Sequence, residues 1–279
     1  MRILGICCIS ILLVLGCETQ DRNENLSPYE NVAAVNTLLL SPINIAMAFA
    51  NHQLDEVVDY HINIDVFDTT QLDGTPFAAS VDFGSGFLGK DGHKRGGIWM
   101  IQWHEGLVGE IDTVWMNLAA NYADTGYQNV RLSWNDEEVY TNGLLLLVKK
   151  KNQFELQLDL TLQTTKFKFM SNLTALASVN NDKLISPSVW DQTSFEWGGE
   201  FIQTIRSSNE QFTYAISAEN LSRKSGCIKG FTKGAMHCTQ KQPNDNEDFS
   251  FDFDPFGDEP CDEKALLIKG KTERVITLW

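Results

Sequence analysis

The feature that most constrains the fold is a run of alternating residues between Gln153 and Leu162. In a β-strand successive side chains point to opposite faces, so a period of two predicts a strand with one buried and one solvated face. Strands of this kind belong to antiparallel sheets. The apolar set is Phe154, Leu156, Leu158, Leu160 and Leu162, and the polar set is Gln153, Glu155, Gln157, Asp159 and Thr161.

Strand-like segments follow one another from residue 62 to the C-terminus, with short polar breaks between them. Strands at intervals of about ten residues are typical of sandwiches and meanders. We therefore predict a mainly β fold, an antiparallel β-sandwich or large β-meander with an N-terminal helix packed on it. The expected strands cover residues 62–66, 81–83, 98–103, 110–118, 130–134, 143–149, 154–169, 194–197, 201–206 and 212–218.

The C-terminal stretch 249–279 repeats the outline of residues 81–103: an aromatic and acidic strand, glycine turns, and an aliphatic strand. Phe249, Phe251 and Phe253 alternate with polar residues, which predicts a half-buried strand. We interpret the echo as a duplicated β unit. The β domain would then span residues 62–279, with a break between its halves near 172–187.

Residues 31–61 form the one segment with helical periodicity, as apolar residues recur at close to 3.6-residue spacing. Ser41 and Pro42 are suited to a helix N-cap and first turn. We expect a helix that covers one face of the β domain; the alternative is a docking helix for a partner. The apolar face holds Ile43, Met47, Ala50, Leu54, Val57 and Val58, and the polar face Asn44, Asn51, Asp55 and Asp59.

Residues 1–17 have the form of a targeting segment, with one charge at Arg2 and an apolar run from Ile3 to Leu15. The run ends in Gly16 and Cys17, which resembles the bacterial lipobox, where the cysteine is acylated and anchors the protein in a membrane. The alternative is an ordinary signal peptide with a chance cysteine. Polar residues 18–30 would form a flexible tether, and we expect no later segment apolar enough to span a bilayer.

The chain carries 22 Lys and Arg residues against 37 Asp and Glu residues, a formal net charge of −15. Binding to phosphate backbones needs clustered basic residues, so we predict no nucleic-acid partner. A cation, a neutral glycan or a protein ligand is easier to accommodate.

The segment from Asp245 to Glu263 is acidic and holds no basic residue. Within it, Asp252, Asp254, Gly257 and Glu263 have the spacing of an EF-hand calcium loop. Phe256 stands at a ligand position, and the flanking segments are strands rather than helices. The hypotheses are a calcium site formed by Asp252, Asp254 and Glu263, or a solvated acidic turn without a cofactor.

We assign no catalytic residue, because the histidines lack metalloprotease spacing and no nucleotide-binding loop is present. The sequence favours a non-catalytic envelope protein that acts in binding, adhesion or scaffolding. The alternative is an extracytoplasmic glycan hydrolase with paired carboxylates. Tryptophans such as Trp99 and Trp115 lie in apolar runs and are expected in the core rather than on a glycan-stacking surface.

After export, Cys227, Cys238 and Cys261 would remain in an oxidising compartment, where three thiols allow one disulfide. The residues alone leave the pairing open, with Cys227–Cys238 as one choice.

From residue 81 onward the order of turn motifs resembles an uncharacterised family of lipoproteins from Bacteroidetes. The matching stretches are 83–86, 91–97, Cys227, 257–262 and 269–271. Here Ser85 replaces an Asp, Phe87 a common Cys, and Glu259-Pro260 interrupts the second Gly-Asp-Gly. The resemblance implies a Cys227–Cys261 disulfide and an outer-membrane lipoprotein on the periplasmic face or the cell surface. It implies no activity.

Overall fold

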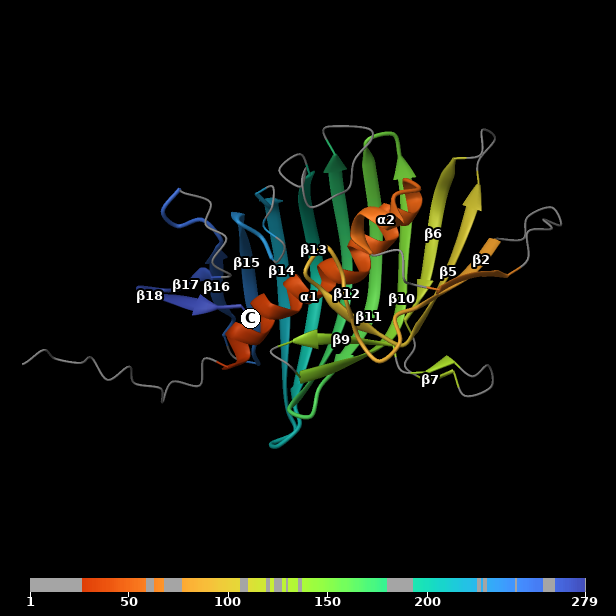
Figure 1. Ribbon diagram of the computed structural model, residues 1–279. Helices are drawn as coiled ribbons and strands as arrows, with labels where there is room; N and C mark the ends of the chain where they lie inside the picture. The colour runs from red at the N-terminus through yellow and green to blue at the C-terminus, as the bar shows by residue number, and fades with distance from the viewer. Residues whose placement is uncertain are drawn as a thin grey trace, which may run out of the picture.

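The structure is a computed structural model, and its description covers residues 27–58, 63–67, 77–105, 110–118, 121–122, 127–128, 130–134, 137–179, 193–224, 227, 230–243, 245–257 and 264–278. It confirms a mainly antiparallel β fold with one long N-terminal helix packed on the sheet (Figure 1). The helices are α1 (Ser27–Ala50) and α2 (Leu54–Val57).

The strands fall into one large sheet and one isolated pair. Their bounds are β1 (Asn63–Phe67), β2 (Phe77–Asp82), β3 (Phe87–Leu88), β4 (Lys94–Gly96), β5 (Ile98–Glu105), β6 (Ile111–Asn117), β7 (Asn121–Tyr122), β8 (Tyr127–Gln128), β9 (Arg131–Trp134), β10 (Glu137–Lys150), β11 (Gln153–Gln163), β12 (Phe167–Val179), β13 (Thr193–Ile205), β14 (Glu210–Ser222), β15 (Lys233–Lys241), β16 (Glu247–Asp252), β17 (Lys264–Lys269) and β18 (Thr272–Thr277).

The large sheet is antiparallel. From β10 to β18 it is a meander in which neighbours in sequence are neighbours in space, whereas β2 pairs with β5 and β6 with β10 across intervening short strands. Its order is β1-β2-β5-β6-β10-β11-β12-β13-β14-β15-β16-β17-β18. At β10 the sheet divides, because the first residues of this strand pair with β9 and the later ones with β6. β9 continues the branch to β4 and β3. Among the described residues, β7 pairs with β8 alone.

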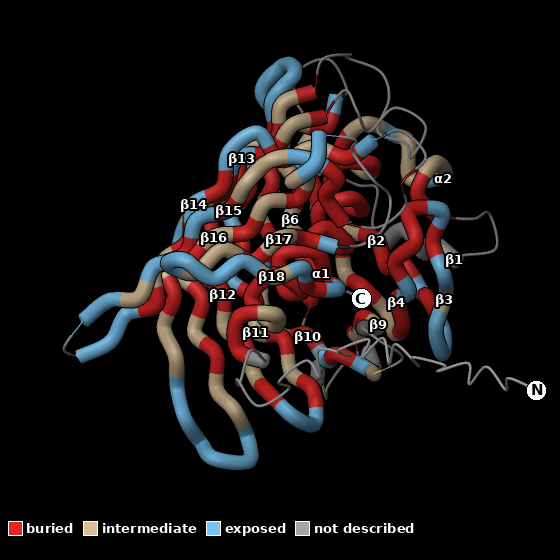
Figure 2. Tube along the Cα trace, turned by 90° about the vertical axis from the view of Figure 1, so that its left-hand side faces the viewer, coloured by how far each residue is buried: buried red, intermediate tan, exposed pale blue. Residues whose placement is uncertain are grey.

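Helix α1 crosses the face of this sheet diagonally (Figure 1) and is buried on all sides, as Figure 2 shows. Every residue from Val32 to Ala48 is buried. A helix that is apolar all round is typical of an interior position. The predicted polar face is therefore wrong for Asn44, which is only 1% exposed. Beyond α1, Asn51 is half-buried and Asp55 is exposed, whereas Asp59 lies outside the described residues.

The helix bounds also differ from the expected ones. α1 runs through Pro42 rather than beginning there, and it ends at Ala50, before the short α2. Proline in a helix interior removes one backbone hydrogen bond. Arg95 Nη2 donates to the carbonyl of the preceding Ser41 at 3.0 Å, and this contact supports the backbone beside the proline.

The expectation of no further segment apolar enough to span a bilayer is wrong as regards length and composition. Residues Pro28–Ala50 pass that test by length and composition, because their polar residues carry almost no charge. In this structure 94% of the apolar window is buried inside the protein, which is the position of a core helix.

The alternation around residues 153–162 is confirmed. The apolar set of β11 is buried in the hydrophobic core, and its polar set faces outward. β11 pairs with β10 on one side and with β12 on the other along its whole length. The outward residues of successive strands therefore lie in straight rows across the sheet.

Two strand boundaries differ from the prediction for local reasons. The expected strand 154–169 is a hairpin, in which the Thr164 hydroxyl accepts hydrogen bonds from the amides of Lys166 and Phe167. Conversely, the expected strands 194–197 and 201–206 are the single strand β13, which continues through Gly198 and Gly199. Of the expected break at 172–187, residues 172–179 belong to strand β12, which pairs with β13, and residues 180–187 lie outside the described residues.

The echo between the two glycine-turn units corresponds to strands at opposite ends of the sheet. β2 pairs with β5 near one edge, and β16 pairs with β17 near the other. Phe249, Phe251 and Phe253 are all buried, as predicted. The rings of Phe249 and Tyr29 pack edge to face, with their centroids 4.8 Å apart. Strand β16 therefore contacts the first turn of α1.

Candidate functional site

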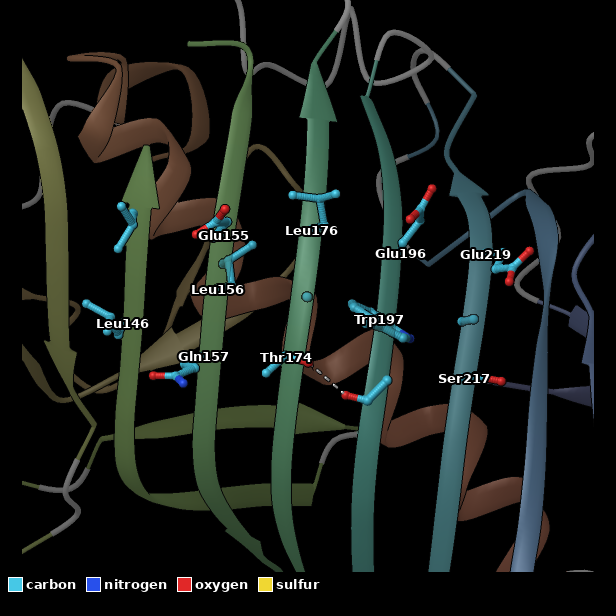
Figure 3. A pocket seen from close by; sticks show the side chains of 14 residues that line it. Leu146, Glu155, Leu156, Gln157, Thr174, Leu176, Glu196, Trp197, Ser217 and Glu219 are labelled. Carbon is cyan, nitrogen blue, oxygen red and sulfur yellow. Dashed lines mark hydrogen bonds between the residues drawn. The ribbon is translucent and has the colours of Figure 1, made fainter. Parts of the chain in front are cut away.

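A groove of about 600 Å³ opens on the outer face of the sheet, across strands β10 to β14 (Figure 3). α1 lies behind these strands, so the groove and the helix are on opposite faces of the sheet. Drug-sized ligands occupy cavities of roughly 300–1,000 Å³. The groove is therefore large enough for a small ligand.

Strand register arranges the groove residues in two rows that run across the strands. The first row is Val148, Glu155, Leu176, Glu196 and, beyond a bulge in the pairing of β13 and β14, Glu219. The second row is Leu146, Gln157, Thr174, Gly198 and Ser217. Residues that are far apart in the sequence thus line one surface.

Gly198 leaves the middle of the second row without a side chain. Its neighbour Gly199 has a φ of +147°, and a Cβ there would lie 2.3 Å from the carbonyl oxygen of Asn172. Only glycine fits this position. The bulge between Phe195 and Trp197 adds a further local bend to the same strand. Together, the bulge and the glycine pair shape the floor of the groove.

One side of the groove is apolar. Leu146 and Val148 of β10 line it. Leu144 lies on the same face of this strand and is 57% exposed. Trp115 of β6 pairs with Leu146 and is half-buried on the outer face. The expectation that Trp115 belongs to the core is therefore wrong, whereas Trp99 is fully buried as expected.

The other side is acidic, and its carboxylates are exposed. Glu155 pairs with Lys150 Nζ at 2.7 Å. Within the described part of the chain, Glu196 and Glu219 have no ion-pair partner. Like charges on neighbouring strands destabilise each other. A cationic group placed between Glu196 and Glu219 would remove this repulsion.

A second, smaller groove of about 360 Å³ lies beside the ends of β10 and β11. Its acidic residues already have partners: Glu137 pairs with Lys166, and Glu138 pairs with Arg131 at 3.2 Å. The Glu138 carboxylate also accepts a hydrogen bond from Tyr140 at 2.9 Å and thereby raises the pKa of this tyrosine. Because its charges are neutralised within the protein, this groove is the weaker candidate.

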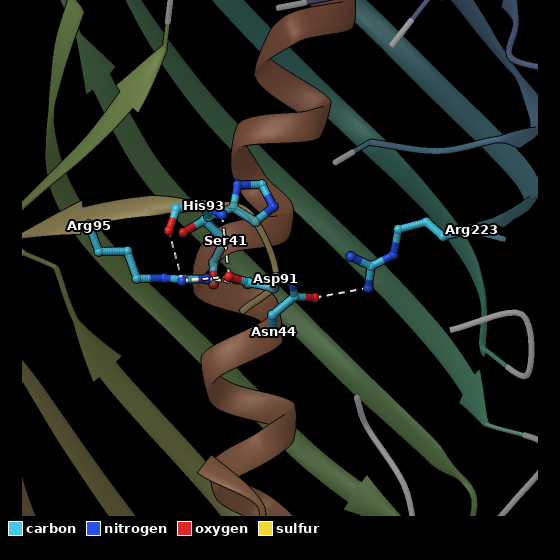
Figure 4. A network of polar contacts seen from close by, with 6 residues as sticks. All are labelled: Ser41, Asn44, Asp91, His93, Arg95 and Arg223. Carbon is cyan, nitrogen blue, oxygen red and sulfur yellow. Dashed lines mark hydrogen bonds and ion pairs between the residues drawn. The ribbon is translucent and has the colours of Figure 1, made fainter. Parts of the chain in front are cut away.

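A buried polar cluster joins α1 to β4, to the residues just before β4 and to the residue after β14 (Figure 4). Its members are Ser41, Asn44, Asp91, His93, Arg95 and Arg223. Asp91 binds Arg95 through both carboxylate oxygens. Asn44 donates from Nδ2 to Asp91 Oδ2 at 2.8 Å and accepts from Arg223 Nη2 at 3.0 Å. The cluster holds its polar groups against one another in the interior, so its role is to fix the position of the helix.

Burial governs the ionisation of this cluster. Burial would raise the pKa of Asp91, but the charge and hydrogen bonds of Arg95, with His93 and Asn44, hold the pKa of this carboxyl below its usual value. Burial lowers the pKa of the Arg223 guanidinium to about 9, and the charge of Asp91 acts in the opposite direction. Both groups remain charged at neutral pH.

The residues predicted to bind calcium are only partly described. Asp252 ends β16, and its Oδ1 accepts a hydrogen bond from the amide of Asp254 at 2.9 Å, which is the geometry of an acidic turn. Glu263 lies outside the described residues. Among the described residues, no group of His, Cys, Asp or Glu side chains could hold a metal ion. The calcium site stays a prediction.

The structure describes two of the three cysteines expected to remain after export. Cys227 is buried and disulfide-bonded, whereas Cys238 is buried and free, so the alternative pairing of Cys227 with Cys238 is wrong. Burial raises the pKa of the Cys238 thiol, which keeps it protonated and unreactive. Cys261 and the lipid-attachment residue Cys17 lie outside the described residues, so their roles stay predictions.

The groove itself was missed by sequence reasoning. Its strands have alternating polar residues, but alternation says only that these residues face outward. A weak signal was present in Gly198-Gly199, because adjacent glycines inside a strand mark a bend or a close approach of backbones. No family model, curated protein or solved structure matches this chain.

Proposed function

We propose that this protein is a lipid-anchored envelope protein with a non-catalytic binding role, and that the outer groove of β10–β14 is its ligand-binding surface. One observation carries the proposal: the groove joins a half-buried apolar strip on β10 to exposed carboxylates on β13 and β14. The lipid anchor rests on residues 1–17 of the sequence.

The surroundings of the groove favour binding over hydrolysis. A glycan hydrolase needs a carboxylic acid that burial keeps protonated at neutral pH. Glu155, Glu196 and Glu219 are all exposed, and they lie on an open sheet face. The interior behind them is filled by α1 and the inward side chains of the strands. A surface of this form suits recognition of a ligand.

The long paired strands also suit a binding surface that keeps its shape. β11, β12 and β13 pair continuously over almost their full length. These backbone hydrogen bonds fix the positions of the outward residues in the two rows. A preorganised surface loses little conformational entropy when it binds.

The proposal is tested by thermal melts of the full chain, purified in a neutral detergent, with separate additions of maltoheptaose, cellohexaose, chitohexaose, calcium and 1,8-diaminooctane. A ligand that binds only the folded state stabilises it by about 2.7 kcal/mol at a hundredfold excess over Kd. We expect at least one of these compounds to raise the melting temperature, and chelation of calcium to leave the protein folded.

The anchor is tested separately. Replacement of Cys17 by Ser should release the protein from the membrane fraction without altering its melting temperature. Membrane retention of the Cys17→Ser protein would contradict the anchor and leave the groove unaffected.

A further inference from the structure

We infer that the ligand of the outer groove is a linear aliphatic amine, a hydrocarbon chain that carries ammonium groups and lies across strands β11 to β14. This inference rests on the proposed function, because it names the ligand class of the same groove. It is argued from the order of apolar and acidic residues along the first row and from the size of the groove.

The first four residues of the first row alternate between apolar and acidic side chains, and the fifth is again acidic. Val148 and Leu176 are half-buried apolar residues, and Glu155 lies between them. Glu196 follows Leu176 on the next strand, and Glu219 follows across the bulge. A chain of methylenes laid along this row would contact the apolar side chains and place its ends beside the carboxylates.

The spacing along the row suits such a chain. Neighbouring strands lie about 4.8 Å apart, so the backbones at Glu155 and Glu196 are separated by roughly 10 Å. This span is comparable with the length of an extended eight-carbon diamine. One ammonium group would share Glu155 with Lys150, the other would meet Glu196 and Glu219, and the methylenes between them would cover Leu176.

Charge complementarity favours a cation at the end formed by β13 and β14. Glu196 and Glu219 have no ion-pair partner within the described residues, and the whole chain has a formal net charge of −15. At the other end, Lys150 is itself an aliphatic ammonium group, and it already binds Glu155. Because Lys150 already neutralises Glu155, the unpaired carboxylates of Glu196 and Glu219 would form the stronger end of the site.

The size of the groove favours a small molecule over a basic segment of a partner protein. A volume of about 600 Å³ accommodates a short chain. Stable protein–protein interfaces bury at least about 1,200 Å² and extend over many more residues. Trp115 beside Leu146 provides an aromatic face near the apolar end, where a cation or methylene group can pack.

The test is calorimetric titration of the full-length protein, in neutral detergent, with 1,8-diaminooctane and with 1,8-octanediol. The diol has the same chain length without charge. We expect the diamine to bind, the diol to bind at least tenfold more weakly, and the affinity for the diamine to fall as salt is added. Magnesium chloride and a short oligolysine peptide complete the set of probes.

The test variant is the double substitution Glu196→Gln with Glu219→Gln, in the groove. The control is the double substitution Asp245→Asn with Glu273→Gln. It removes the same amount of charge from exposed residues outside the groove lining. Exposed ion pairs are individually weak. The first pair should raise the Kd for the diamine about five- to tenfold, and the second pair should leave it within twofold of the unsubstituted protein.

Three results would overturn the inference. Equal binding of the diol would mean that charge is not recognised, equal binding of magnesium would mean counterion association only, and binding of oligolysine without the diamine would point to a basic protein partner. If an oligosaccharide binds and Gly198→Trp abolishes its binding, the groove is a binding site for another ligand class, and only this inference fails. If Gly198→Trp alters the binding of no compound tested, the proposed function fails as well.

Discussion

Asn44 Oδ1 accepts a hydrogen bond from Arg223 Nη2 at 3.0 Å and thereby joins the middle of α1 to the residue that follows β14. These two residues are far apart in the sequence, and both are buried. The same asparagine donates to Asp91, so one side chain bridges two buried charges of opposite sign.

Replacement of Asn44 by Leu should therefore destabilise the protein strongly. Leu has a similar size but can neither accept from Arg223 nor donate to Asp91. Loss of a partner by a buried charged group costs several kcal/mol, and we expect a decrease of about 2–4 kcal/mol in the free energy of unfolding, measured in urea. The exposed Asn172→Leu serves as the control and should change it by less than about 0.5 kcal/mol.

Asp91 predicts a pH dependence. Because the pKa of its carboxyl is depressed in the folded state, the stability it contributes is complete above the unfolded-state value of about 4 and is lost as pH falls toward the folded-state pKa. The difference in unfolding free energy between the unsubstituted protein and Asp91→Asn should therefore shrink between pH 5 and about pH 3. A difference that stays constant over this range would exclude Asp91 as a source of acid sensitivity.

Tyr29 anchors the first turn of α1 in two separable ways. Its hydroxyl donates to Glu247 Oε2 at 2.6 Å and accepts from Lys269 Nζ at 2.9 Å, and its ring packs on Phe249. Tyr29→Phe should cost about 1 kcal/mol by loss of the hydrogen bonds, and Tyr29→Ala about 3–5 kcal/mol by loss of the ring. Equal losses in urea unfolding would mean that the ring contributes nothing.

The glycine pair of β13 predicts opposite outcomes for adjacent substitutions. A Cβ on Gly199 would lie 2.3 Å from the Asn172 carbonyl oxygen, whereas one on Gly198 would lie 3.4 Å from the Ile216 carbonyl oxygen, an ordinary contact. Gly199→Ala should destabilise the protein by more than about 2 kcal/mol, and Gly198→Ala by less than about 1 kcal/mol. Similar melting temperatures for both variants would contradict the close approach at Gly199.

Local patterns predicted the parts of the fold that depend on local chemistry. The period of two in β11 and in the Phe249–Phe253 run reports burial directly, and the structure confirms both. The turn at Thr164 was missed because a threonine hydroxyl closes it in the absence of glycine or proline. The polar residues of α1 suggested a solvated face, but Asn44 has its partners in Asp91 and Arg223, which periodicity cannot identify.

The groove could not be predicted because it depends on register. Glu155, Glu196 and Glu219 share one row only because three successive strand pairs, β11–β12, β12–β13 and β13–β14, adopt one particular register. Trp115 was assigned to the core for the same reason, since an apolar run does not tell which of its residues faces outward.

The most direct test of the groove as the binding surface is to fill it at Gly198 and repeat the thermal melts with the same glycans, calcium and 1,8-diaminooctane. Gly198→Trp places an indole in the middle of the second row, and Gln211→Trp places one on an exposed position of β14 outside the groove lining. We predict that the compound that most stabilises the unsubstituted protein loses its effect on Gly198→Trp and keeps it on Gln211→Trp. An unchanged shift in Gly198→Trp, with the protein still folded, would show that ligands bind elsewhere and would contradict the account.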